Sequence, residues 1–179
     1  MFAGFRFVLA ATKISQHIVD GARTDGIGLF SLPFAQDALS SIEAISRANI
    51  SLPAPLKQAT RIDVHAHVVP PWYRAVVPLT AQNPTPNWTL QDHLSFMADN
   101  SIRHSILSIS APGSTVFPGS KEKSLALARL LNEYLAAVRD NHVRRWHVAN
   151  GVVACAESAG TLLLLCSNAV AVYWCCVSF

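Results

Sequence analysis

The composition of the chain limits what it can be. Its 179 residues are 51% hydrophobic and 14% charged, which excludes a disordered chain and allows one domain with a substantial core. The formal net charge is only +3 and the basic residues are scattered, which argues against a nucleic-acid-binding surface. All four cysteines lie beyond residue 150 without zinc-site spacing, so we interpret them as inert, buried thiols.

Residues 1–59 show no pattern that indicates chemistry. The opening stretch resembles a poor secretion signal, because Arg6 interrupts its apolar run and no small-residue cleavage site is clear. We therefore expect a cytoplasmic protein rather than a secreted one. Apolar residues at helical spacing predict a helix over Ala35–Ala48, and paired prolines predict an extended linker over 50–57. This zone is expected to be a leader or a segment that lies against the following domain.

Residues 60–142 alternate between strand and helix patterns. We predict strands at Arg61–His65 and Ser105–Ser110, and helices at Leu90–Asn100 and Lys121–Asp140. Thr89 and Ser120 stand at the positions that cap these two helices. Alternation of this kind predicts parallel strands joined by crossover helices, as in an α/β barrel.

Residues 143–179 break this alternation and form an apolar tail. The stretch 158–179 contains no charged residue and is long enough to span a bilayer, since about 20 residues suffice, although its polar residues make it a mediocre span. A tail-anchored membrane protein is therefore one alternative for the chain. The abrupt change also suggests a shifted reading frame or a retained intron in the underlying gene.

The pair His65 and His67 is the strongest chemical motif. Side chains at positions i and i+2 of a strand point to the same face, and we expect Asp63 to lie on that face as well. Two neighbouring imidazoles provide half of a divalent-metal site, most often for zinc. The alternative interpretation is a pair of ordinary histidines at a strand end.

Several stretches around this motif resemble one family. They resemble the amidohydrolase superfamily, in its aminocarboxymuconate-semialdehyde decarboxylase-like branch, and within it fungal proteins similar to 6-methylsalicylate decarboxylase. The matching stretches are Arg61–His67, Pro70–Arg74, His93–Ile102, Ser105–Gly113 and Leu131–Tyr134. The resemblance covers less than half of the chain. It implies an incomplete TIM-type (β/α)8 metal-dependent hydrolase barrel, with its first two βα units flanked by unrelated N- and C-terminal segments.

The resemblance also implies roles for individual residues. His65 and His67 would bind a divalent metal, most often Zn, whereas the family takes its other ligands, a histidine and an aspartate, from strands beyond residue 142. His142 and His147 do not match those motifs, and His93 and His104 are expected to be solvated. Trp72 would either stack on a planar substrate or pack beneath its loop, and Arg74 would attract a carboxylate.

The function that this resemblance implies is metal-dependent, non-oxidative decarboxylation of an aromatic or enal carboxylic acid. Two alternatives stay open: metal-dependent hydrolysis of a small molecule, and a truncated, inactive chain. A partial barrel would leave sheet edges unpaired, which favours homo-oligomers or aggregation.

Overall fold

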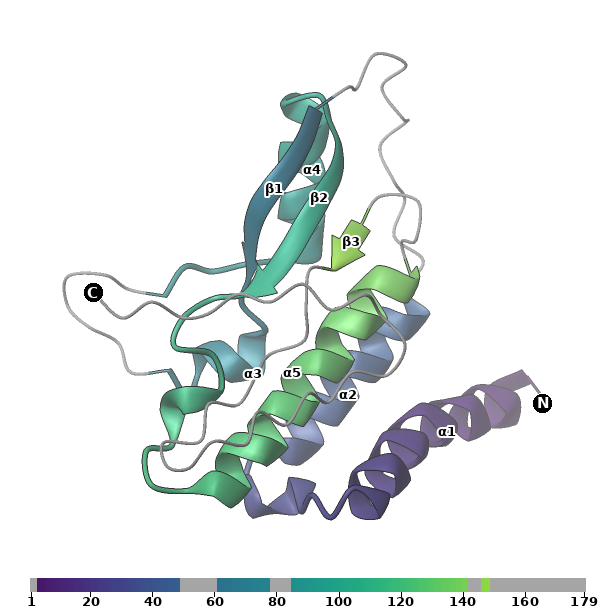
Figure 1. Ribbon diagram of the computed structural model, residues 1–179. Helices are drawn as coiled ribbons and strands as arrows, with labels where there is room; N and C mark the ends of the chain where they lie inside the picture. Colours follow the sequence, from purple (N-terminus) through teal and green to yellow (C-terminus); the bar gives the residue numbers. More distant parts are fainter. Residues whose placement is uncertain (1–2, 49–60, 78–84, 142–145, 149–179) are drawn as a thin grey trace.

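A computed structural model describes residues 3–48, 61–77, 85–141 and 146–148, and for residues 3–12 and 146–148 it describes the backbone alone. Figure 1 shows the elements in order along the chain. They are α1 (Ala3–Thr24), the short 3-10 helix η1 (Leu29–Ser31), α2 (Ala35–Arg47), β1 (Arg61–Val68), α3 (Pro71–Arg74), α4 (Leu90–Asp99), β2 (Ile102–Ile109), the 3-10 helix η2 (Gly113–Val116), α5 (Lys121–Asn141) and β3 (Trp146–Val148).

The strands form one parallel sheet in the order β1-β2-β3, with α4 and α5 as the two crossover helices. This confirms the predicted α/β alternation, although β1 continues past the predicted end at His65, and β2 begins before the predicted Ser105 and ends at Ile109. The sequence did not predict β3, because a strand of three residues is too short to show a period.

Local capping explains where the crossover helices begin. The Thr89 side chain accepts a hydrogen bond from the backbone N–H of Asp92 at 3.0 Å, which satisfies an otherwise unpaired donor in the first turn of α4. The Ser120 side chain likewise accepts a hydrogen bond from the backbone N–H of Lys123 at the start of α5, at a longer distance of 3.4 Å. Both predicted caps are therefore confirmed.

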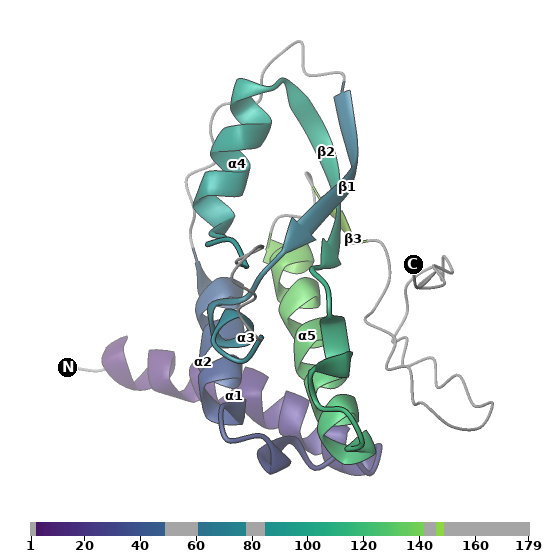
Figure 2. The ribbon, with the colours of Figure 1, turned by 90° about the vertical axis from the view of Figure 1, so that its left-hand side faces the viewer.

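The core lies between α5, α2 and the sheet. Helix α2 ends at Arg47, one residue before the predicted end, and runs beside α5 in both views (Figures 1 and 2). Each helix buries one stripe of apolar side chains, as its helical spacing requires. The buried residues of α2 are Ala35, Ala38, Leu39 and Ile42, and those of α5 include Leu127, Leu130, Leu131, Tyr134, Leu135 and Val138. Helix α2, which precedes the sheet in the chain, is thus an integral part of this core.

Helix α4 lies along one side of the β1–β2 pair, as Figure 2 shows. Its buried residues are Leu90, Leu94 and Met97. Among the described residues, no helix is both long and apolar enough to cross a bilayer. The apolar stretch 158–179 and the cysteines lie outside the described residues.

Candidate metal site

His65 and His67 converge at the C-terminal half of β1. Their Nε2 atoms lie 3.0 Å apart, and their rings meet edge to face with centroids 4.8 Å apart. Both side chains are exposed. Two imidazole nitrogens on a tetrahedral zinc ion, each at about 2.0–2.1 Å from it, would be about 3.3 Å apart. The observed spacing differs from this by only a few tenths of an ångström, so the pair fits two positions of a zinc site.

Ser108 on β2 lies beside His67. Its register partner is His67, and its Oγ lies 3.4 Å from His67 Nδ1 and 3.5 Å from the carbonyl oxygen of Ala66. A histidine that donates from Nδ1 keeps its Nε2 lone pair available for a metal, which is the arrangement that second-shell partners provide. No signal in the sequence identifies Ser108, because its role depends on the pairing of two strands.

Asp63 does not share the face of the two histidines, so that prediction is wrong. The Oγ of Ser105 donates to Asp63 Oδ2 at 3.3 Å, which places the carboxylate on the Ser105 side of the sheet. Ser105 and Ser108 are an odd number of residues apart and point to opposite faces. The cause is a β-bulge, since β1 advances three residues from Asp63 to Ala66 while β2 advances two.

His93, on α4, lies on the same side of the sheet as Asp63. Trp88 Nε1 donates to His93 Nδ1 at 3.4 Å, and the side chain is partly buried rather than solvated as expected. Burial lowers the pKa of His93 because it disfavours the charged imidazolium, and the negative charge of Asp63 opposes this in part. His104 is likewise only partly exposed.

Trp72 lies in the interior below the loop that follows β1. Only 6% of its surface is exposed, its ring stacks on Phe34 at 5.8 Å, and Tyr134 meets it edge-on at 6.3 Å. Within the described part of the chain its indole N–H has no hydrogen-bond partner. A substrate would reach this ring only if the covering aromatic side chains moved.

Arg74 and Tyr73 project differently from the same short helix, α3. Arg74 is exposed, and its Nε donates to the carbonyl oxygen of Thr85 at 3.1 Å. Tyr73 is fully buried, and its hydroxyl donates to the carbonyl oxygens of Ser110 and Gly113, at 3.2 and 3.0 Å. Burial raises the pKa of Tyr73 to about 12. Tyr73 therefore ties together the loops that follow β1 and β2, a role that the sequence did not reveal.

The described residues supply only part of a metal site. No group of three or more histidine, cysteine, aspartate or glutamate residues with metal-binding geometry occurs among them. His142 and the side chain of His147 lie outside the described residues. Among the described residues, the histidine pair therefore fits two ligand positions.

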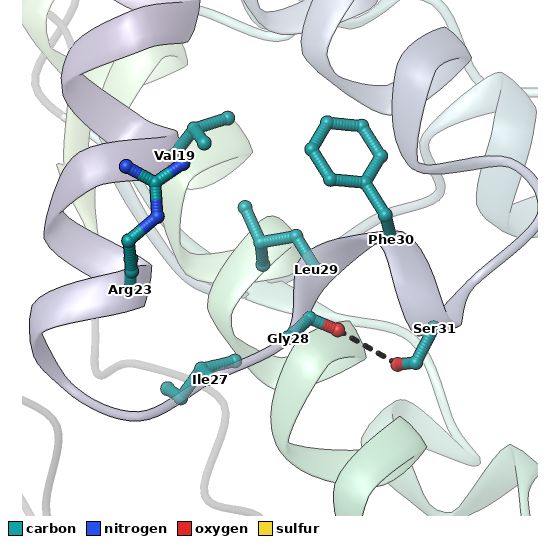
Figure 3. A pocket seen from close by; sticks show the side chains of 7 residues that line it. All are labelled: Val19, Arg23, Ile27, Gly28, Leu29, Phe30 and Ser31. Atoms are coloured by element: carbon teal, nitrogen blue, oxygen red, sulfur yellow. Dashed lines mark hydrogen bonds between the residues drawn. The ribbon is translucent and has the colours of Figure 1, made fainter.

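A shallow pocket of about 200 Å³ lies elsewhere, between the end of α1 and η1 (Figure 3). Val19, Ile27, Leu29 and Phe30 make it mainly apolar, and its one ionisable residue, Arg23, pairs with Asp20 at 3.1 Å. Figure 3 shows the hydroxyl of Ser31 bonded to the Gly28 carbonyl rather than free for a ligand, at 2.8 Å. We do not assign it a role in the chemistry of the histidine pair.

Comparison with known proteins relates the chain to fungal decarboxylases. It is 42% identical over 78 residues to the decarboxylase macB of Penicillium terrestre, a match that covers 41% of this chain and 23% of that protein. It is 37% identical over 90 residues to the decarboxylase yanB of Aspergillus niger, covering 48% of this chain and 24% of that protein. It is 32% identical over 106 residues to the 6-methylsalicylic acid decarboxylase of Penicillium expansum, covering 57% and 32% respectively.

No family model matches the chain. A crystal structure described as an amidohydrolase II is similar at 33% identity with a TM-score of 0.46, over 50% of this chain and 30% of that one. The chain spans between about a quarter and a third of the length of the curated relatives that it matches. Over the matched part, the curated relatives confirm the predicted similarity to fungal decarboxylases, among them a 6-methylsalicylic acid decarboxylase.

Proposed function

We propose that the chain carries the first part of the active site of a metal-dependent decarboxylase that acts on a small aromatic or enal carboxylic acid. Its sheet would be the start of a TIM-type barrel. The observation that carries the proposal is the convergence of His65 and His67 Nε2 at 3.0 Å, at the C-terminal half of a parallel strand. In barrels of this type the catalytic groups gather at the C-terminal ends of the strands.

The roles of the individual residues follow from their positions. His65 and His67 would hold a divalent cation, most often zinc, and Ser108 would fix the tautomer of His67. When bound, the cation supplies a positive charge that orients the substrate and stabilises negative charge. Exposed Arg74 would attract the carboxylate, and buried Trp72 would support the loop from beneath.

Metal binding by single-residue variants tests the proposal. Full-length protein is loaded with Zn²⁺ or Co²⁺, and bound metal is measured by elemental analysis and by the visible absorption of Co²⁺. We expect His65→Ala and His67→Ala each to lose most of the binding. The matched control is His17→Ala, because His17 is an exposed histidine on α1. Equal metal binding in the wild type and both site variants would refute the proposed metal role.

Carbon dioxide release is measured separately, with 6-methylsalicylic acid and related aromatic acids as substrates. Release that depends on His65 and His67 supports the decarboxylase. Metal binding without release of carbon dioxide from any of these acids would contradict their proposed decarboxylation and would leave the metal site supported.

A further inference from the structure

The backbone of β1 is irregular directly before the histidine pair. Asp63 pairs with Ser105 and Ala66 pairs with Leu107, so β1 contains one residue more than β2 in this interval. The extra residue lies at Val64–His65 and forms a β-bulge. Bulges of this kind redirect the side chains that follow them and occur often beside active sites.

Asp63 contacts both sides of this bulge. Its Oδ1 accepts the backbone N–H of His65 at 3.1 Å, and its Oδ2 accepts the hydroxyl of Ser105 at 3.3 Å. Ser105 is fully buried, so its hydroxyl is held in place by the surrounding protein. One carboxylate therefore connects the first histidine of the pair to a fixed point on the neighbouring strand.

The bulge decides on which face of the sheet Asp63 lies relative to the histidine pair. Without the extra residue, Asp63 and His65 would share a face, whereas here His65 meets His67 on the opposite face from Asp63. The backbone N–H of His65 donates to the side chain of Asp63, so this carboxylate helps to fix the backbone that carries the first imidazole. Loss of that acceptor would release the backbone at His65, so the imidazole that this backbone carries would no longer be held at a fixed position relative to His67.

We propose that Asp63 is a positioning residue that holds the bulge through the His65 amide and thereby keeps His65 and His67 converged for metal binding. This inference rests on the proposed metal site. The carboxylate acts through the backbone of His65 and is not itself a ligand, because it points to the other face of the sheet. Outer-shell groups of this kind commonly affect metal affinity about 10–100-fold.

Two variants separate the hydrogen bonds of Asp63 from its charge. Asp63→Ala removes both acceptors, and we expect Zn²⁺ affinity to fall about 10–100-fold. Asp63→Asn keeps an acceptor for the His65 N–H and a group that bonds Ser105, so it is expected to stay within a few-fold of the wild type. The matched control is Asp99→Ala, which removes an exposed acid from the end of α4 and should change nothing.

Zn²⁺ affinity is measured in full-length protein by competition with a chromophoric chelator, and the melting temperature of each metal-free variant is recorded beside it. Exchange of the His65 amide proton is followed by NMR in the metal-free protein, where Asp63→Ala should accelerate it and Asp63→Asn should not. Ser105→Ala keeps the carboxylate but removes one anchor, so an intermediate loss of affinity is expected. It also provides a test if Asp63→Ala does not fold.

The outcomes distinguish this inference from the proposed function. If Asp63→Ala binds Zn²⁺ as tightly as the wild type while His65→Ala does not, the positioning role is wrong and the metal site stands. The positioning role is also wrong if Asp63→Asn loses as much affinity as Asp63→Ala. If the wild type binds no Zn²⁺, the proposed function fails, and unchanged exchange of the His65 amide in Asp63→Ala would overturn the inference as well.

Discussion

The hydroxyl of Tyr73 is the best place to test how the two loops beyond β1 and β2 are held together. Tyr73→Phe removes one oxygen atom and leaves the ring, which is fully buried, in place. The hydroxyl carries a single hydrogen, which the carbonyl oxygens of Ser110 and Gly113 share at 3.2 and 3.0 Å. The variant therefore removes a donor from two acceptors without changing the shape of the core by more than one atom.

The expected loss follows from this geometry. Leaving a buried polar group unpaired costs about 1–3 kcal/mol, and because one hydrogen is shared between two acceptors, we expect about 1–2 kcal/mol for Tyr73→Phe. For a chain of this length that corresponds to a decrease of roughly 2–8 °C in melting temperature. Thr24→Val is the control, since it removes an exposed hydroxyl that donates to the Asp20 carbonyl at 2.9 Å and should change stability by less than about 0.5 kcal/mol.

The pH dependence adds a second, independent signature. Burial raises the pKa of Tyr73 to about 12, whereas a tyrosine in the unfolded chain has a pKa of about 10. Above that pH the unfolded state releases its proton first, so the stability contributed by Tyr73 is complete below about pH 10 and is lost as pH rises towards 12. The stability difference between the wild type and Tyr73→Phe should therefore shrink above pH 10.

Urea denaturation followed by circular dichroism measures both effects. The midpoint should fall in Tyr73→Phe at pH 7 while the slope of the transition stays constant, because the exposed area does not change. A midpoint equal to that of the wild type at pH 7 would refute the conclusion that this hydrogen bond links the two loops. A difference that stays constant from pH 9 to pH 11 would contradict the assignment of the raised pKa.

Three further predictions concern other parts of the fold. Arg129 donates to Asp25 at 2.6 Å and its side chain is only 17% exposed, so Arg129→Ala should lower the free energy of unfolding in urea by about 1–2 kcal/mol. The control is Arg23→Ala, which removes an exposed ion pair, and an equally small loss in both variants would contradict the prediction. Since burial lowers the pKa of His93, the unfolded chain takes up a proton first as pH falls below about 6.5, and stability falls with it. Between pH 7 and pH 5 the melting temperature of His93→Gln should therefore change less with pH than that of the wild type. The same change in both proteins would contradict this. Val64 is 69% exposed on β1, which is an end strand of the sheet formed by the described residues, so Val64→Lys should reduce self-association in sedimentation velocity. The same association in both proteins would exclude this surface.

The sequence by itself determined the elements that depend on local pattern. The helices α2, α4 and α5 follow from apolar residues at helical spacing, and their ends agree with the predicted ends within one residue. The caps at Thr89 and Ser120 follow in the same way, because a capping side chain bonds its own chain a few residues away. The convergence of His65 and His67 was also predictable, since residues two apart on a strand share a face when no bulge separates them.

Only the tertiary structure decided the surroundings of that pair. Asp63 turns away from the histidines because β1 gains a residue relative to β2, and Ser108 reaches His67 because the two strands pair in that register. Trp72 is covered by Phe34, directly before α2, and by Tyr134 of α5, and both are far from the loop along the sequence. Periodicity within one segment encodes the segment's own conformation, whereas the register of a strand and the burial of a ring depend on the free energy of contacts between segments that are distant along the chain.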